Sequence, residues 1–213
     1  MLVWDWAYVL AAGLAAGGVT AMIFGIRRDY RLRASAISAA LAMAAGAALL
    51  LAGAVPALAA LAGIAAGLAC ANAILDLVEG LVADIASFGI GVTGLGAAVL
   101  IVPPGQTLIS ALLVSAGGGL LAAAILGGVA AFYRWRRGQA GLGSGDIVLA
   151  GAAGLWAGIS LVGISLLIAC AATFLIALIT RRLRERIAFA PGLALGFGAA
   201  FVIRVSAWPD LQL

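Results

Sequence analysis

Residues 147–180 read IVLAGAAGLWAGISLVGISLLIACAATFLIALIT and contain no charged side chain. An α-helix rises about 1.5 Å per residue, so about 20 apolar residues are needed to cross the hydrocarbon core of a bilayer. The stretch is therefore long for one membrane span and short for two, and we expect two short helices that turn near residues 160–163. Backbone groups inside a bilayer must bond within the protein, which favours helices throughout.

The composition of the whole chain also indicates a membrane protein. Of its 213 residues, 66% are hydrophobic and 9% are charged, whereas soluble domains carry about 25% charged residues. The apolar runs are long and unbroken, unlike the short alternating strands of a β-barrel. The sequence therefore predicts an all-α fold in which residues 1–213 form a single polytopic membrane bundle of about eight transmembrane helices. The expected spans are residues 6–26, 34–54, 57–75, 86–103, 107–132, 147–161, 162–180 and 187–204.

The basic residues predict how these spans are oriented. All twelve are arginines, and eleven of them follow the first, fifth or seventh expected span. Cytoplasmic loops are enriched in Lys and Arg, so this face is assigned to the cytoplasm and both termini lie outside. Only Arg204, at the outer end of the last span, departs from the pattern. The net charge of +4 then reflects orientation in a lipid bilayer, and no nucleic-acid partner is expected.

Two acidic residues at the cytoplasmic boundary are the candidate catalytic groups. Asp76 ends the third expected span, and Asp146 opens the sixth. An acid at this depth suggests a functional site, although aspartate is also a common N-cap of a helix. Two carboxyl groups a few ångströms apart can share one proton, because both cannot ionise cheaply. One carboxylate can then activate water while its protonated partner polarises a carbonyl group.

Three residues near Asp76 are weaker candidates. Asn72 lies one helical turn earlier, where it either bonds the aspartate or makes a polar contact with another helix. Glu79 and Asp84 either belong to the site or only solvate the cytoplasmic loop. The two cysteines of the chain lie inside apolar runs without the C-x-x-C spacing of a zinc or redox site. We therefore expect no metal site at the cysteines.

The segment around Asp146 carries a motif. Residues 143–158 read GSGDIVLAGAAGLWAG, so Gly143 and Gly145 precede the aspartate. This pattern resembles the G-x-G-D-x-K-L signature of bacterial prepilin peptidases, also called type IV leader peptidases, which are GxGD membrane aspartic peptidases. The lysine of that signature is replaced here by Val148.

Two further segments resemble motifs of the same family. Residues 76–84 read DLVEGLVAD and are similar to its first aspartate motif, with Ala83 in place of a proline. Residues 189–196 read FAPGLALG and are similar to its F-G-P-x-L-A-L-G stretch, in which Pro191 matches. The three motifs occur in the family's order, and the resemblance covers residues 57–204.

The resemblance implies that Asp76 and Asp146 are the catalytic pair of an endopeptidase. Such enzymes remove the basic leader from prepilin or pseudopilin precursors at the cytoplasmic face of the bacterial inner membrane, just before the apolar helix of the pilin. The chain looks like the short members that lack a methyltransferase region, so zinc and S-adenosylmethionine are not expected. Two other hypotheses stay open. One is a catalytically silent homologue that acts in pilus or secretion assembly, and the other is a transporter whose intramembrane acids bind a cation or proton.

Overall fold

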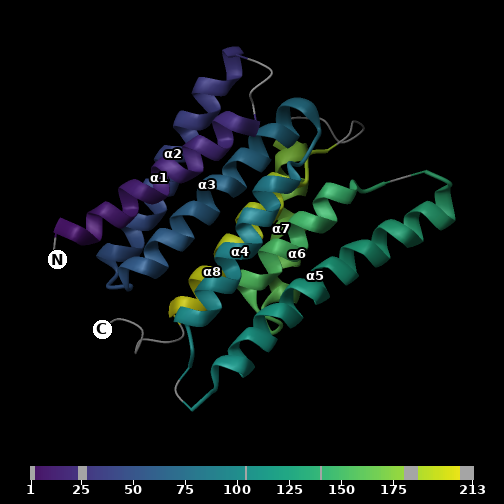
Figure 1. Ribbon diagram of the computed structural model, residues 1–213. Helices are drawn as coiled ribbons and strands as arrows, with labels where there is room; N and C mark the ends of the chain where they lie inside the picture. Colours follow the sequence, from purple (N-terminus) through teal and green to yellow (C-terminus); the bar gives the residue numbers. More distant parts are fainter. Residues whose placement is uncertain (1–2, 24–27, 104, 140, 180–186, 207–213) are drawn as a thin grey trace.

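The described part of the chain is entirely helical. The computed structural model describes residues 3–23, 28–103, 105–139, 141–179 and 187–206. Within these ranges the chain forms eight helices and no strand, which confirms the expected all-α fold (Figure 1). The helices are α1 (Val3–Ile23), α2 (Arg28–Leu51), α3 (Pro56–Glu79), α4 (Asp84–Leu100), α5 (Leu108–Arg137), α6 (Ser144–Ala157), α7 (Val162–Ile179) and α8 (Ala190–Ser206).

Proline and glycine set several helix ends. Pro56 opens α3, where the N–H group that proline lacks has no partner in the helix. Gly80 ends the same helix with a φ of 65°, a left-handed conformation that suits glycine. Gly158, with a φ of 69°, ends α6, and α7 begins at Val162. The expected break between the sixth and seventh helices is therefore confirmed, although it begins slightly before residues 160–163.

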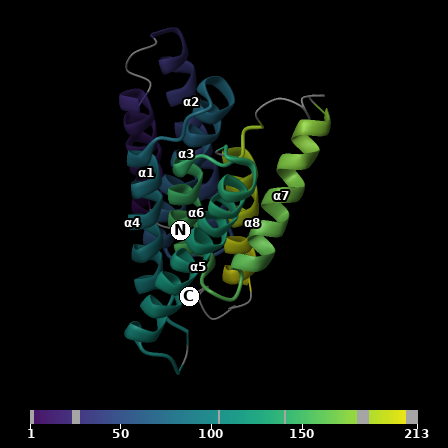
Figure 2. The ribbon, with the colours of Figure 1, turned by 90° about the vertical axis from the view of Figure 1, so that its right-hand side faces the viewer.

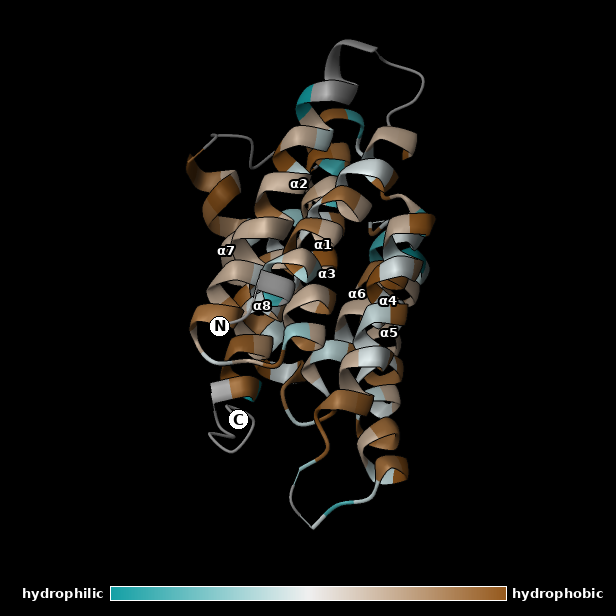
Figure 3. Ribbon diagram, turned by 60° about the vertical axis from the view of Figure 1, so that its left-hand side comes forward, coloured by the Kyte–Doolittle hydropathy of each residue, from teal (hydrophilic) through white to brown (hydrophobic). Residues whose placement is uncertain are grey.

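Five of the described helices are long and apolar enough to cross a membrane, namely α1, α2, α3, α5 and α7. The helices α4, α6 and α8 are apolar but shorter, with 17, 14 and 17 residues. Many large apolar side chains are exposed, among them Leu14 at 79%, Leu120 at 74% and Phe88 at 72%. Figure 3 shows apolar residues along the sides of the helices. Such a surface is suited to lipid contact, because extended apolar patches are rare on soluble monomers.

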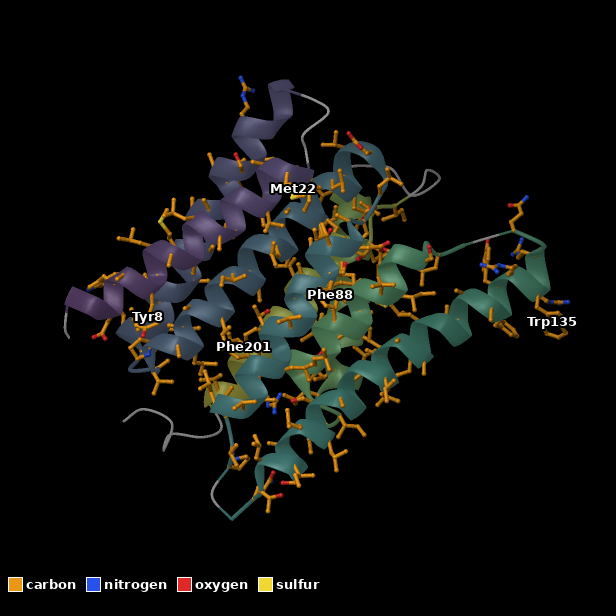
Figure 4. All side chains as sticks on the ribbon, viewed as in Figure 1. Tyr8, Met22, Phe88, Trp135 and Phe201 are labelled. Atoms are coloured by element: carbon orange, nitrogen blue, oxygen red, sulfur yellow. The ribbon has the colours of Figure 1, made fainter. Side chains whose placement is uncertain are left out.

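Helix α3 packs against four neighbours. α1 and α2 contact α3 and each other, while α4 and α8 contact α3 from other directions. α6 packs against α4, α5 and α8, and α7 packs mainly against α8, at the edge seen in Figure 2. The C-terminal part of α5 leans away from the other helices, and Trp135 projects from it (Figure 4).

Glycines let α6 and α8 pack closely on their neighbours. A Cβ atom added at Gly154 of α6 would lie 2.5 Å from the carbonyl oxygen of Gly118 in α5. One added at Gly192 of α8 would lie 2.5 Å from the carbonyl oxygen of Ala169 in α7. Both distances are far shorter than a carbon–oxygen contact allows, so each pair of helices depends on a small residue at the crossing.

One end of the arrangement gathers acidic residues. α3 ends where α4, α6 and α8 begin, as Figure 1 shows. Asp76 and Glu79 of α3 therefore lie at the same end as Asp84 of α4 and Asp146 of α6, and we call this the acidic end. The first described turn of α1 and the last of α8 lie at the opposite end. Part of the arginine pattern, at residue 27 and at residues 181–186, falls outside the described residues, as do the outermost residues of both termini.

Candidate active site

Asp76 connects the end of α3 to the start of α8. Its side chain is only 8% exposed. Its Oδ2 atom accepts a hydrogen bond from the Ala190 N–H group at 2.9 Å. Ala190 is the first residue of α8, so its N–H has no partner within the helix, and the positive end of the helix dipole favours a carboxylate there. The carboxylate is thus oriented by a helix more than one hundred residues further along the chain.

Asp146 lies in the first turn of α6 and is also 8% exposed. Its Oδ2 atom accepts a hydrogen bond from the Gly143 N–H group at 3.3 Å. Gly143 has the extended backbone of an N-cap residue, and Asp146 occupies the third helical position after it. The interpretation of Asp146 as the N-cap itself is therefore wrong, because its carboxylate reaches back to the cap. The backbone of the glycine motif orients this carboxylate.

Two packing contacts hold the aspartate-bearing segments at the acidic end. A Cβ atom added at Gly145 would lie 2.8 Å from the Cβ atom of Val82, so the connection between α3 and α4 lies directly against the start of α6. Helix α8, whose first N–H group bonds Asp76, packs against both α3 and α6. Only glycine at position 145 leaves room for this approach. The structure thus places Asp76 and Asp146 at the same end of the described bundle, where the connection that follows α3 meets the start of α6.

Asn72 fastens the connection between α3 and α4. Its side chain is fully buried, its Oδ1 atom accepts a hydrogen bond from the Ala83 N–H group at 2.9 Å, and its Nδ2 atom donates to the Ser87 hydroxyl at 3.2 Å. Of the two expectations for Asn72, the polar contact with another helix is the one observed. Ala83 is the N-cap of α4 and has no side-chain cap of its own. The proline that the peptidase motif has at this position would lack the N–H that Asn72 bonds. The replacement by Ala83 therefore permits a hydrogen bond that the motif's proline could not make.

The remaining candidates lie near or at the surface of the acidic end. Glu79 is the last residue of α3 and Asp84 the first of α4, and both are exposed. Asp84 stands at a helix N-terminus, where a negative charge is favourable. Pro191 is the second residue of α8 and follows Ala190, which bonds Asp76. Val148 is 47% exposed, so the residue that replaces the lysine of the motif lies outside the packed core.

A buried arginine lies towards the other end of α6. Arg204 of α8 is 8% exposed, and one of its terminal nitrogens donates to the carbonyl oxygen of Trp156 at 2.8 Å. Both terminal nitrogens also lie 3.5 Å from the Ser115 hydroxyl of α5. Trp156 belongs to the last turn of α6, where a cation meets the negative end of the helix dipole. Sequence reasoning gave Arg204 no role, although its departure from the charge pattern was a signal.

The acidic end provides two largely buried carboxyl groups, each of which accepts a hydrogen bond from a backbone N–H group. Such groups can act as general base and general acid when both reach the same peptide bond. Among the described residues, no three His, Cys, Asp or Glu side chains gather in a way that would hold a metal ion.

Comparison with known proteins gives no match to a family model, and no curated protein or solved structure is significantly similar to the chain. The likeness to prepilin peptidases therefore depends on the three short motifs alone. The role of Asp76 and Asp146 is accordingly inferred from those motifs and from the geometry of the two side chains.

Proposed function

We propose that the protein is a membrane aspartic endopeptidase that removes the basic leader from prepilin-like or pseudopilin precursors. The observation that carries the proposal is the occurrence of two largely buried carboxyl groups, Asp76 and Asp146, on separate helices at one end of the bundle. A buried carboxyl group is costly unless it is hydrogen-bonded, paired or neutral, and ionisable groups buried in this way cluster at functional sites, so two at one end of the bundle favour an acid–base site. The motifs around both residues resemble those of the prepilin peptidases.

In the proposed reaction, one aspartate is ionised and the other is protonated. The ionised carboxylate takes a proton from a water molecule, which attacks the carbonyl carbon of the scissile peptide bond. The protonated carboxyl group donates to the carbonyl oxygen and stabilises the tetrahedral intermediate. Collapse of that intermediate breaks the C–N bond as the first carboxyl group passes the proton it took from water to the leaving amine. The other carboxylate regains its proton from a hydroxyl group of the collapsing intermediate, so both aspartates return to their starting states. Neither a metal nor a cofactor takes part in these steps.

We further propose that all eight helices cross the bacterial inner membrane, with the acidic end in the cytoplasm and both termini outside. Arg134, Arg136 and Arg137 lie in the last turn of α5, which leads into α6 and the acidic end, and arginines of this kind favour the cytoplasmic side. The short helices α4, α6 and α8 pack among longer neighbours, and a bilayer can thin locally to accommodate them.

The test is removal of the leader from a co-expressed prepilin by wild type, Asp76→Asn and Asp146→Asn. Asparagine keeps a side-chain oxygen for the Ala190 or Gly143 N–H group, so each variant retains the hydrogen bond but loses the ionisable carboxyl group. We expect each substitution to lower the cleavage rate by at least about a hundredfold, the lower range for a lost acid–base group. Asp5→Asn, at the opposite end of the bundle, is the control and should leave cleavage unchanged.

Two outcomes would contradict the proposal. Cleavage that survives both active-site substitutions would exclude the aspartate pair as the catalytic groups. A wild-type protein that cleaves no prepilin-like substrate, while its thermal unfolding shows a stable fold, would favour the catalytically silent homologue. Uptake of a cation or of protons by proteoliposomes, lost in Asp76→Asn, would instead favour the transporter.

A further inference from the structure

An apolar groove runs over α3 between α2 and α8. It encloses a volume of about 670 Å³. α2 and α8 pack against α3 from two sides, and the face of α3 between them is only partly covered: Ala66, Ala69 and Ala73 are half-buried. The floor is formed by small residues of α3, namely Ala62, Ala66, Ala69 and Ala73. The wall on α8 combines the small Ala194 and Gly198 with larger side chains such as Leu195 and Phe201, and residues of α6 also line the groove.

The floor of this groove has the spacing of a helix-packing surface. Ala62, Ala66, Ala69 and Ala73 recur every three or four residues and therefore lie on one face of α3. From the first to the last they extend about 16 Å along the helix axis, which is about three turns. A row of small residues lets a second helix approach with its backbone close. The floor thus suits the close approach of about three turns of a further apolar helix, which is about half the length of a membrane span.

One end of the groove opens beside the candidate catalytic residues. Ala73 lies one helical turn before Asp76 on α3, and Pro191, which also lines the groove, follows the residue whose N–H bonds Asp76. Glu79 and Asp84 are exposed at this same end. A helix that occupies the groove would therefore end next to Asp76, and a basic segment attached to it would meet negative charge.

We propose that this groove binds the apolar transmembrane helix of the substrate, with the N-terminal end of that helix at the acidic end. The proposal depends on the peptidase function given above, because it names how the substrate of that site is held. It explains how a basic leader is drawn to a protein whose cytoplasmic face is otherwise rich in arginine: Glu79 and Asp84 attract the leader locally. The peptide bond between the leader and the helix then lies beside Asp76.

The decisive variant is Gly198→Leu, because Gly198 faces the groove and a Cβ atom added there would meet nothing within 4 Å. Leucine at this position should fill the groove without displacing the protein's own atoms. Gly128→Leu in α5 is a matched control, since a Cβ atom at Gly128 also meets nothing within 4 Å and the residue does not line the groove. Both variants replace a helical glycine by the same good helix former.

Two readouts separate the groove from the peptidase function. The first is kcat/KM for cleavage of a full-length prepilin in proteoliposomes, which we expect to fall at least tenfold in Gly198→Leu and to stay within twofold in Gly128→Leu. The second is photo-cross-linking of a prepilin that carries a photoreactive residue in its apolar helix to the Asp76→Asn chain, followed by peptide mapping. We expect cross-links to α3 and α8 that Gly198→Leu abolishes and Gly128→Leu preserves.

The outcomes distinguish the possible failures. Normal cleavage and cross-linking by Gly198→Leu would overturn the groove as the binding site and leave the peptidase function standing. Capture of the prepilin helix by a wild-type chain that never cleaves it would support the groove and overturn the peptidase. A groove that releases a bound lipid on Gly198→Leu, with cleavage unchanged, would identify an acyl chain as the occupant and overturn the proposal.

Discussion

Replacement of Asn72 by alanine tests whether a single buried amide holds the acidic end together. The amide accepts a hydrogen bond from the Ala83 N–H group and donates one to the Ser87 hydroxyl, and it is fully buried. Asn72→Ala removes both bonds and leaves the N–H of the α4 N-cap without this partner. Because the neighbouring Val82 packs against Gly145, loss of these bonds should loosen the contact with the start of α6 as well.

The magnitude follows from the two hydrogen bonds. Each is worth about 0.5–1.5 kcal/mol net, so their loss should lower the free energy of unfolding by about 1–3 kcal/mol. Polar contacts between membrane helices average about 0.6 kcal/mol, which sets the lower end near 1 kcal/mol for two of them. The double variant Asn72→Ala/Ser87→Ala should lose less stability than the two single variants lose together, because both substitutions remove the same Asn72–Ser87 hydrogen bond.

The assay is reversible unfolding in mixed micelles titrated with a denaturing detergent, followed by circular dichroism. Thr93→Val is the control, because the Thr93 hydroxyl bonds only the carbonyl oxygens of Gly89 and Ile90 in its own helix. This control should cost less than about 1 kcal/mol, since those carbonyls lie within the helical turn. If Asn72→Ala costs less than about 0.5 kcal/mol, below one net hydrogen bond, the amide does not hold the connection and the reasoning is refuted.

Three further predictions concern packing and charge. Gly154→Ala should destabilise the protein by about 1–3 kcal/mol, because the added methyl group collides with the backbone of α5. Gly128→Ala, where the methyl group meets nothing, should stabilise it by up to about 1 kcal/mol. Thermal unfolding of the two variants measures the difference. Trp156→Ala should lower the free energy of unfolding by about 3–5 kcal/mol, because the indole is 5% exposed and its N–H donates to a carbonyl oxygen of α4. Trp135→Ala, at a position that is 80% exposed, should change the free energy of unfolding little. Asp84→Lys should raise the KM for a basic-leader substrate severalfold at low salt and lose this effect at high salt, which kinetics at two ionic strengths would measure.

The all-α architecture was predictable because it depends on composition and on long apolar runs. The number of helices also followed from charges and glycines between runs, and the break after α6 was anticipated. The ends were harder to place. α5 continues to Arg137, beyond the expected limit of residue 132, because arginine is a good helix former and Gly138 supplies the left-handed end. α6 begins at Ser144 rather than residue 147, because the Gly143 backbone already starts the helix.

Less of the candidate site was predictable, because its contacts join distant parts of the chain. The motifs led to Asp76 and Asp146, but nothing local indicated that Asp76 would bond the first N–H of α8. Asn72 was recognised as polar within an apolar run, whereas its partners Ala83 and Ser87 depend on how α4 folds back on α3. The groove over α3 could not be inferred from sequence, because it depends on how far apart α2 and α8 lie where both pack against α3.

Because α6 is short, the thickness of the bilayer should affect how deep Asp146 lies relative to water. Its 14 residues extend about 21 Å, about 9 Å less than a typical hydrocarbon core. Its C-terminal turn is held by Arg204, and the next residues are joined to α5 where the Ile159 N–H donates to the Val114 carbonyl oxygen. Under the proposed membrane placement, with that end fixed, Asp146 at the other end could not move outward to meet a thicker membrane. Lipids with long acyl chains would then leave its carboxyl group recessed below the water, and the choice of lipid would govern access to the proposed scissile bond.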